Sequence, residues 1–487
     1  MLPRARTPRP ARRAGLLVRL ALAALLAAAP LGFAGARPPA AAASAARGLV
    51  DVHLLEVGHD ERVRLFDDYV RLRVRYLRVG VAWKLAEPQA GVYDEAYLGA
   101  LADVAALARE RGIRLVITFS GTPWWASDRS LWDDPPGGYS PGRYYDFYPP
   151  ATSRLDDFGA FVREVATRLQ GAVHGYECWN EPNLWVFLFP QTRGDDDRFA
   201  ARRYIAMLDA MAAAVRAADP QALVIGGATA PVGRNNRYWT APQRFARQLR
   251  ELGAAALFDA YSHHPYVPGG ADDMAPEAKP ADADADYIVR LGNIETLLDI
   301  FPGKPFYLSE FGYNTLYSEM FAGLPVNQAT QAAYLRRAYR FASRFDQVRT
   351  LMWYLHRDWS PTGTEGTKKG VYTGLRRVEG QRKRSWYAYA GGNRLTLAAP
   401  LHASGGRATL RGRLTSTRLT LSFTAKGVAG ATVDVQCLRD GRWRTLTTVK
   451  TAADGTWRAT VPLSRSTTFR AAWRGVVTSP KDRVLVP

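Results

Sequence analysis

Eight short apolar segments, separated by amphipathic helical stretches, occupy the sequence between about Gly48 and Asn393. Nearly continuous apolar runs of this length are typical of strands in a parallel sheet that is covered on both faces. The segments are residues 50–55, 76–81, 115–119, 173–179, 223–227, 258–264, 305–308 and 351–355. Helical patterns between them include residues 97–111, 158–169, 204–218 and 329–344. Eight strand–helix units in roughly 345 residues favour an α/β fold of the (β/α)8 TIM-barrel type over an open doubly wound sheet. We assign this barrel to residues 48–393.

After the barrel the pattern changes to short alternating strands, for example residues 409–414, 432–437 and 457–461. Asp-Gly pairs at 440–441 and 454–455 are typical of hairpin turns. This spacing predicts a small C-terminal β-sandwich, an Ig-like accessory domain over residues 401–487, with residues 398–400 as the linker. Residues 394–487 hold 16 Lys or Arg against four Asp, so that +12 of the total net charge of +20 lies in this tail.

The first 36 residues have the pattern of a signal peptide. Six arginines and no acidic residue occur in them, an apolar run covers residues 15–29, and the small residues Ala34-Gly35-Ala36 offer a cleavage site. No later run reaches about 18 apolar residues, so we expect a secreted, extracellular protein without a membrane span in the mature chain. The two cysteines, Cys178 and Cys437, fall in different predicted domains, which argues against a disulfide framework.

Two glutamates stand at the ends of predicted strands. Glu181 lies in the motif WNEPN at 179–183, and Glu310 follows 129 positions later in LSEFG at 308–312. In a parallel barrel both would lie at the face where active sites are built. A pair of carboxylates there is what retaining glycoside hydrolysis requires, because one protonates the leaving oxygen and the other attacks the anomeric carbon. The alternative for each glutamate is a solvated loop residue or a salt-bridge partner.

Residues 50 to about 390 resemble the clan A glycoside hydrolases, in particular the family 39 β-xylosidases and their endoglycosidase relatives. The resemblance rests on Asn-Glu-Pro after the fourth strand and on a glutamate at the end of the seventh. It implies that Glu181 is the acid/base and Glu310 the nucleophile. It also implies that Asn180 holds the sugar 2-hydroxyl and that Arg78 lies near the nucleophile.

The resemblance further implies that His264 and Tyr266, after the sixth strand, hydrogen-bond the nucleophile. Alternatives remain at each supporting position. Arg78 could form an ordinary ion pair with Glu177, Asn180 could cap the turn, and His264 could be a core histidine with His263 in its place.

Sugars bind to aromatic platforms because the CH face of a pyranose is apolar. Four tryptophans near strand ends are candidates for such platforms, with core packing as the alternative for each: Trp83, Trp124, Trp185 and Trp353. The resemblance implies that Trp353 lies beneath the reacting sugar, although the neighbouring Tyr354 points to the other face of its strand.

These observations predict a secreted retaining glycoside hydrolase that degrades a polysaccharide or oligosaccharide. The reaction needs no cofactor, and no Cys/His cluster suggests a metal site. A catalytically silent glycan-binding barrel at the cell surface is the alternative function. We expect a carbohydrate as the partner of the barrel and an anionic cell-surface polymer as a partner of the basic tail, with a solvated spacer as the alternative for the tail. No motif supports binding of nucleic acid.

Overall fold

The computed structural model describes residues 45–133, 140, 142–268, 273–319, 324–417, 425–473, 477–479 and 481–486. The signal peptide expected over residues 1–36 lies outside them. Within the described ranges, no helix combines the length and apolar character needed to cross a lipid bilayer. Cys178 and Cys437 are both buried free thiols.

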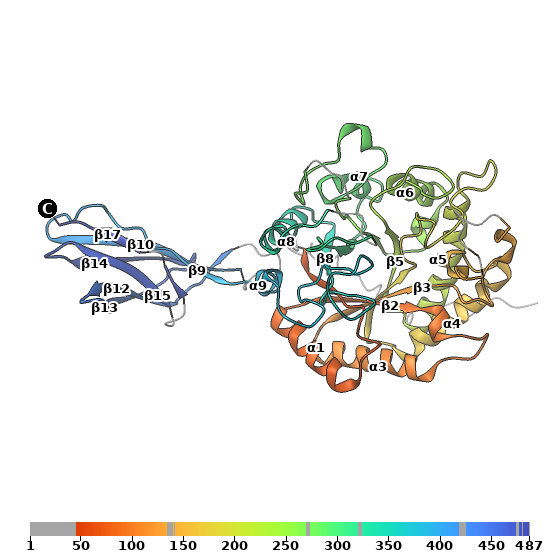
Figure 1. Ribbon diagram of the computed structural model, residues 1–487, viewed down its shortest axis with the longest axis horizontal. Helices are drawn as coiled ribbons and strands as arrows, with labels where there is room; N and C mark the ends of the chain where they lie inside the picture. The colour runs from red at the N-terminus through yellow and green to blue at the C-terminus, as the bar shows by residue number, and fades with distance from the viewer. Residues whose placement is uncertain are drawn as a thin grey trace, which may run out of the picture. The chain divides into compact units, whose positions relative to one another are not determined.

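Eight parallel strands form the closed barrel that the sequence predicts (Figure 1). Each strand pairs with its neighbours in chain order, and β8 returns to pair with β1. The strands are β1 Ala46–Val50, β2 Tyr76–Ala82, β3 Arg114–Ser120, β4 Val173–Cys178, β5 Leu223–Thr229, β6 Ala260–His263, β7 Phe306–Phe311 and β8 Val348–Tyr354. This order brings the ends of β2, β4, β6 and β7 to one rim of the barrel.

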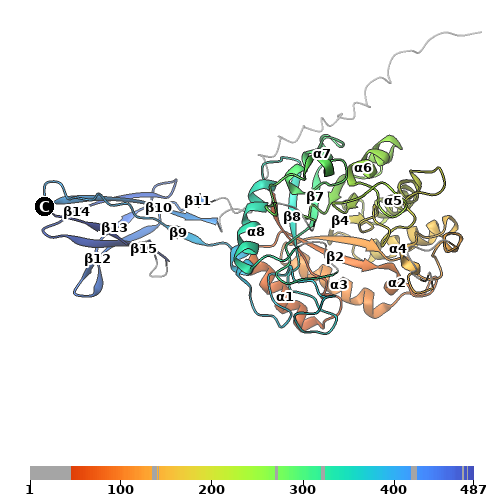
Figure 2. The same ribbon diagram turned by 45° about the horizontal axis from the view of Figure 1, so that its top comes forward.

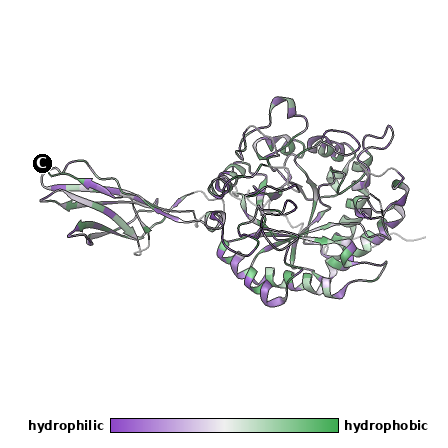
Figure 3. Cartoon of the chain, viewed as in Figure 1, coloured by the Kyte–Doolittle hydropathy of each residue, from purple (hydrophilic) through white to green (hydrophobic). Residues whose placement is uncertain are grey.

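Helices cover the outside of the barrel (Figure 2). Their polar residues face outward and their apolar residues face the strands, as Figure 3 shows for the helices α1 and α3. The helices are α1 His59–Leu72, α2 Trp83–Ala86, α3 Glu95–Glu110, α4 Leu155–Arg168, α5 Phe199–Ala218, α6 Pro242–Glu251, α7 Glu295–Leu298, α8 Gln328–Ala342 and α9 Arg384–Ala390. The four helices expected from periodicity correspond to α3, α4, α5 and α8.

The first strand lies earlier in the chain than we expected. The alternating apolar residues 50–55 predict a strand, but β1 ends at Val50 and residues 51–55 form the loop after it. The reason is the buried Asp51. Its carboxylate accepts hydrogen bonds from the backbone N–H of His53 at 2.9 Å and from the hydroxyl of Tyr69 at 2.6 Å, and such a side-chain bond turns the backbone away from the ladder.

The barrel closes at Gly48, where two strands come too close for a side chain. A Cβ atom on Gly48 would lie 2.5 Å from Cγ of Met352 and 2.6 Å from Oγ1 of Thr350. The carbonyl of Gly48 accepts hydrogen bonds from the hydroxyls of Tyr339 at 3.0 Å and Tyr389 at 2.7 Å. Glycine is therefore required by packing at this point of β1.

The C-terminal residues form two antiparallel sheets that share an apolar core, consistent with the expected β-sandwich. One sheet holds β9 Asn393–Leu395, β10 Arg407–Ser416, β11 Lys426–Gly427 and β14 Thr456–Pro462. The other holds β12 Thr432–Arg439, β13 Arg442–Lys450, β15 Thr467–Trp473, β16 Val477–Thr478 and β17 Asp482–Val484.

Two details of the tail differ from the sequence-based expectation. The expected linker 398–400 is part of the sheet region, because Ala398 exchanges backbone hydrogen bonds with Arg411 and β9 already pairs with β10. Asp440-Gly441 is the expected hairpin turn between β12 and β13, with φ of 50° and 72°. The second pair, Asp454-Gly455, joins β13 to β14, which lie in different sheets and so form no hairpin.

Replacement of Gly48 by alanine will destabilise the protein, because the added methyl overpacks the closing strand pair. We expect Gly48→Ala to lower the free energy of unfolding by about 1–3 kcal/mol. Gly99→Ala is the matched control, since Gly99 lies on the exposed side of α3 with nothing within 4 Å of its Cβ position. There the same change should stabilise the helix by about 0.5–1 kcal/mol. Urea unfolding measures both, and equal effects would contradict the packing argument.

Candidate active site

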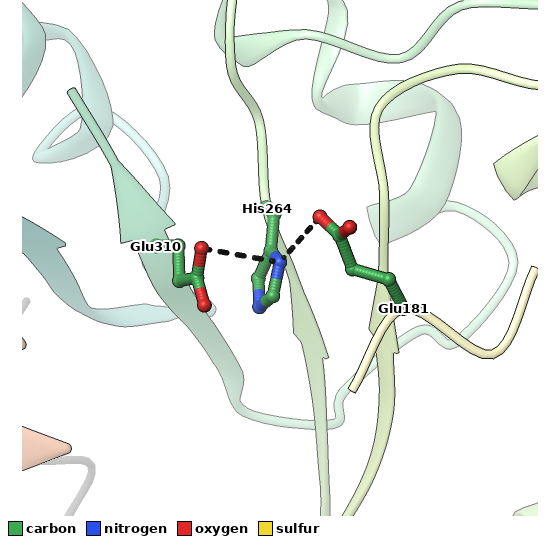
Figure 4. A group of neighbouring side chains, drawn as sticks. All are labelled: Glu181, His264 and Glu310. Carbon is green, nitrogen blue, oxygen red and sulfur yellow. Dashed lines mark hydrogen bonds and ion pairs between the residues drawn. The ribbon is translucent and has the colours of Figure 1, made fainter. Parts of the chain in front are cut away.

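Glu181 and Glu310 face each other at the rim of the barrel, with His264 between them (Figure 4). Glu310 is the fifth residue of β7, and Glu181 follows the end of β4 by three residues. One carboxylate oxygen of each glutamate and one ring nitrogen of His264 lie within 4.8 Å of one another. This closeness fits the separation of about 5–5.5 Å between the carboxyl groups of retaining glycosidases, rather than the 6.5–9.5 Å of inverting ones.

A strained turn after β4 places Glu181. Trp179 and Glu181 both have positive φ, 64° and 41°, and each such residue other than glycine costs on the order of 1–3 kcal/mol. The buried Asn183 holds this turn: its side-chain oxygen accepts from the N–H of Ala230 at 2.8 Å, and its amide donates to the carbonyl of Thr240 at 3.0 Å. The WNEPN motif therefore contains both the candidate acid and the residue that fixes its backbone.

Arg78 connects three side chains of the site. Its guanidinium donates to Glu310 at 2.5 Å, to Glu177 at 2.7 Å and to Oδ1 of Asn180 at 3.0 Å. Burial lowers the pKa of Arg78, but the two carboxylates outweigh it and hold the pKa above its usual range. The Arg78–Glu177 ion pair, which the sequence left as the alternative, and the contact with Glu310 are thus both present. Asn180 is oriented by the same guanidinium.

Tyr266 hydrogen-bonds the candidate nucleophile, whereas His264 does not. The hydroxyl of Tyr266 donates to Oε2 of Glu310 at 2.8 Å. Burial and the nearby Glu310 raise the pKa of Tyr266 well above its ordinary value, so the hydroxyl keeps its proton. Nδ1 of His264 lies 2.9 Å from Oε1 of Glu181 and 3.7 Å from Glu310. The expected partner of His264 was therefore the wrong glutamate.

The two groups of the Glu181–His264 contact are shifted toward their neutral forms. Burial raises the pKa of Glu181 to about 7, against a smaller lowering by Arg78. Burial also lowers the pKa of His264 to about 4. A protonated carboxyl that faces a neutral imidazole is the state expected of a general acid before it acts. The alternative residue, His263, is a satisfied core side chain, with Thr229 at 2.8 Å and the carbonyl of Val289 at 2.9 Å.

The four candidate tryptophans divide into two groups. Trp83 and Trp353 are fully buried; the indole of Trp83 donates to Glu87 and that of Trp353 to the carbonyl of Thr373. The structure therefore does not bring these two to the site. Trp124, 42% exposed, and the partly buried Trp185 lie in the loops after β3 and β4, where a sugar could reach them.

Tyr354 also lies at the site, although no sequence motif marks it as a site residue. Its ring packs edge-on against Tyr266 at 6.4 Å, and burial together with Glu310 raises its pKa. Thus Tyr354, the last residue of β8, lies at the site, whereas Trp353 does not. Strand alternation contains this information, because Tyr354 has the same parity as the inward-facing Thr350 and Met352.

Glu181, His264 and Glu310 also form a cluster of possible metal ligands among the described residues. Both oxygens of Glu310, however, already accept hydrogen bonds, one from Arg78 and one from Tyr266. These two donors hold the carboxylate of Glu310 in place, and beside Glu181 with its raised pKa the group fits acid–base and nucleophilic chemistry.

Residues 63–354, more than half of the chain, match the family model described as "Cellulase (glycosyl hydrolase family 5)". The chain belongs to this family. It is thus a glycosidase of clan A, as the sequence motifs predicted. No curated protein matches the sequence.

Solved structures agree on the fold. A family 39 glycoside hydrolase from the gut symbiont Bacteroides cellulosilyticus WH2 has 16% identity and a TM-score of 0.50, over 85% of this chain and 80% of that one. GH5_18 from Streptomyces cattleya has 16% identity and a TM-score of 0.51, over 72% and 80% of the two chains. The expected likeness to family 39 is supported by the first of these, while the family model is that of family 5.

The raised pKa of Glu181 makes a prediction for stability. Between the unfolded pKa of about 4.3 and the folded value of about 7, the native protein holds a proton that the unfolded chain has released, so stability falls as pH rises through this range. Glu181→Gln has no such loss. We expect the free energy of unfolding of Glu181→Gln, relative to that of the wild type, to increase by about 2–3 kcal/mol from pH 5 to pH 8.

Chemical denaturation of both proteins at the two pH values measures this difference. The matched control is Glu95→Gln, because Glu95 lies on the surface at the start of α3. Its stability difference from the wild type should not grow in that direction. A constant difference for Glu181→Gln would mean that burial does not raise the pKa of this carboxyl.

Proposed function

We propose that the protein is a retaining glycoside hydrolase in which Glu310 is the nucleophile and Glu181 the acid/base. The observation that supports this assignment is the contrast between the surroundings of the two carboxyl groups. One oxygen of each lies within 4.8 Å of the other, so that both could contact the same glycosidic bond. Glu310 accepts hydrogen bonds from Arg78 and Tyr266, while the half-buried Glu181 has the neutral His264 as its partner and a pKa raised by desolvation. Donors favour the ionised form of a carboxyl group and burial favours the protonated form.

The reaction has two steps. In the first, a carboxylate oxygen of Glu310 forms a bond to the anomeric carbon, the glycosidic C–O bond breaks, and Glu181 gives its proton to the leaving oxygen. In the second, Glu181 takes a proton from water, whose oxygen attacks the anomeric carbon and releases Glu310. Asn180, oriented by Arg78, would hold the sugar 2-hydroxyl, in line with its place in the motif.

We infer that the enzyme acts outside the cell on a polysaccharide or oligosaccharide. The support for export is the basic and then apolar pattern of residues 1–36. The rival function is a silent glycan-binding barrel. The intact carboxylate pair and its donors favour turnover, since binding alone requires neither the strained turn at Glu181 nor its raised pKa.

Removal of each glutamate will reveal its role through rescue by azide. Both Glu181→Ala and Glu310→Ala should lose about 10²–10⁴-fold or more in turnover. With an activated aryl glycoside, azide should restore the Glu181 variant and give a glycosyl azide with the anomeric configuration of the substrate. The Glu310 variant should give the opposite anomer. Product NMR distinguishes them, and exchanged anomers would reverse our assignment.

The pH profile of the reaction provides an independent check. Because Glu181 must be protonated to act, kcat/KM should fall as pH rises through about 7. An aryl glycoside with a good leaving group, such as 2,4-dinitrophenolate, needs no proton, so the Glu181→Ala variant should show no such fall with that substrate. If the basic limb persists in the variant, another group is responsible for it.

A further inference from the structure

One face of the C-terminal sandwich is formed almost entirely by arginines and threonines. In β10 the residues Ala408, Leu410 and Leu414 are buried in the core. The alternate residues therefore point away from the core. Together with their neighbours on β9 and β14 they form what we call the arginine face: Arg394, Arg407, Arg411, Arg413 and Arg458, with Thr409, Thr456 and Thr460 between them.

The strand register places like charges opposite each other on this face. Arg411 of β10 is directly paired with Arg458 of β14. The Cβ atoms of directly opposed residues lie about 5 Å apart, and like charges at such positions are destabilising. The threonines Thr409 and Thr460 fill the next pair with a hydrogen bond between their hydroxyls at 3.0 Å.

Among the described residues, only one carboxylate is known to act on these charges: that of Asp454, in the turn before β14, interacts electrostatically with Arg413. The strands β9, β10, β11 and β14 contain no Asp or Glu. Within the part of the chain that the structure describes, none of the five guanidinium groups forms an ion pair, and Arg413 donates to the backbone carbonyl of Asp454 instead. All five side chains belong to exposed residues. The face is thus a concentrated positive surface, and an anion bound there would reduce the repulsion between Arg411 and Arg458.

We propose that the arginine face binds an acidic polysaccharide. Guanidinium groups pair with carboxylates or sulfates through two parallel hydrogen bonds, which lysines cannot do. Arg407 and Arg413 are six residues apart, so that the charges extend for about 20 Å along β10. An extended polymer with regularly spaced anionic groups matches such a row, whereas a small anion would engage only one or two arginines.

The residue types on the arginine face favour an acidic polysaccharide over nucleic acid and over anionic membranes. Proteins that bind single-stranded nucleic acid without sequence preference stack bases on exposed aromatic rings, and the arginine face has none among its described residues. Interfacial membrane binding requires apolar side chains that enter the acyl region, and the outward residues are Arg, Thr and Pro462. A glycan is also the class of polymer on which a family 5 enzyme acts. The proposal does not depend on the roles of Glu181 and Glu310.

The test compares two triple variants of the full chain that lose the same charge. Arg407→Gln/Arg411→Gln/Arg458→Gln removes the centre of the arginine face. Arg439→Gln/Arg442→Gln/Arg444→Gln is the control, because these three exposed arginines lie at the hairpin between β12 and β13, in the other sheet. Binding to polygalacturonate (carboxylate) and to heparin (sulfate) is measured at 0.05 and 0.5 M salt, with dextran as the uncharged glycan.

We expect the face variant to bind at least one acidic polysaccharide about tenfold or more weakly than the wild type, and the control to lose about threefold or less. The face variant loses the repulsion between Arg411 and Arg458, so its thermal unfolding midpoint should be equal to or higher than that of the wild type. Weaker binding by this variant would then not be caused by unfolding. Turnover of a small neutral aryl glycoside should be the same in all three proteins.

Three results would overturn the proposal. Equal losses in both variants would mean that only net charge matters, and unchanged binding in the face variant would mean that the arginines are solvated surface. Tighter, face-dependent binding to single-stranded DNA or to phosphatidylglycerol vesicles would assign the face to that partner instead. The salt series separates charge pairing from a neutral sugar site, because only the former weakens strongly at 0.5 M.

Discussion

The site depends on one buried guanidinium. Arg78 is the third residue of β2, is buried inside the barrel and donates to Glu177, Glu310 and Asn180 at the same time. Without it, two carboxylates would share a buried space with no compensating charge, which costs several kcal/mol per ion. Glu177 balances the charge of Arg78 and fixes its orientation, together with Thr118, which donates to the same Glu177 oxygen at 2.8 Å. The candidate nucleophile is therefore held directly by Arg78, which Glu177 and Thr118 fix in place.

The two candidate catalytic carboxylates differ because their partners differ. Glu310 lies between two donors whose own pKa values are raised, so both keep their protons over the whole working range. Glu181 faces a histidine whose pKa burial has lowered to about 4. Desolvation raises the pKa of Glu181 and also keeps His264 neutral. A protonated, positively charged His264 would lower the pKa of Glu181 again. One carboxyl group is thus suited to attack and the other to proton transfer, within a single pocket.

The barrel and its two glutamates could be predicted from the sequence because the patterns that indicate them are local along the chain. Apolar runs, helical periodicity and the order of the motifs need no knowledge of which strand lies next to which. Two of the differences between expectation and structure have a common cause, namely side-chain contacts between distant segments. His264 faces Glu181 because the turn after β4 carries Glu181 to the end of β6. Strand β1 ends at Val50 because Asp51 accepts a hydrogen bond from Tyr69 of α1. Trp353 is a different case, because the alternation of β8 by itself places this residue on the face opposite Tyr354, in the core.

The strained turn after β4 explains why the motif around Glu181 extends over five residues. Left-handed backbone at Trp179 and Glu181 is unfavourable for residues with a Cβ, so other contacts must hold it. Asn183 supplies them: it is fully buried and its side chain bonds backbone groups of the segment after β5. The N–H of Glu181 also donates to the carbonyl of Ala228 at 2.9 Å. The acid is thereby anchored to the neighbouring strand end, and its carboxyl group stays beside His264 without any help from substrate.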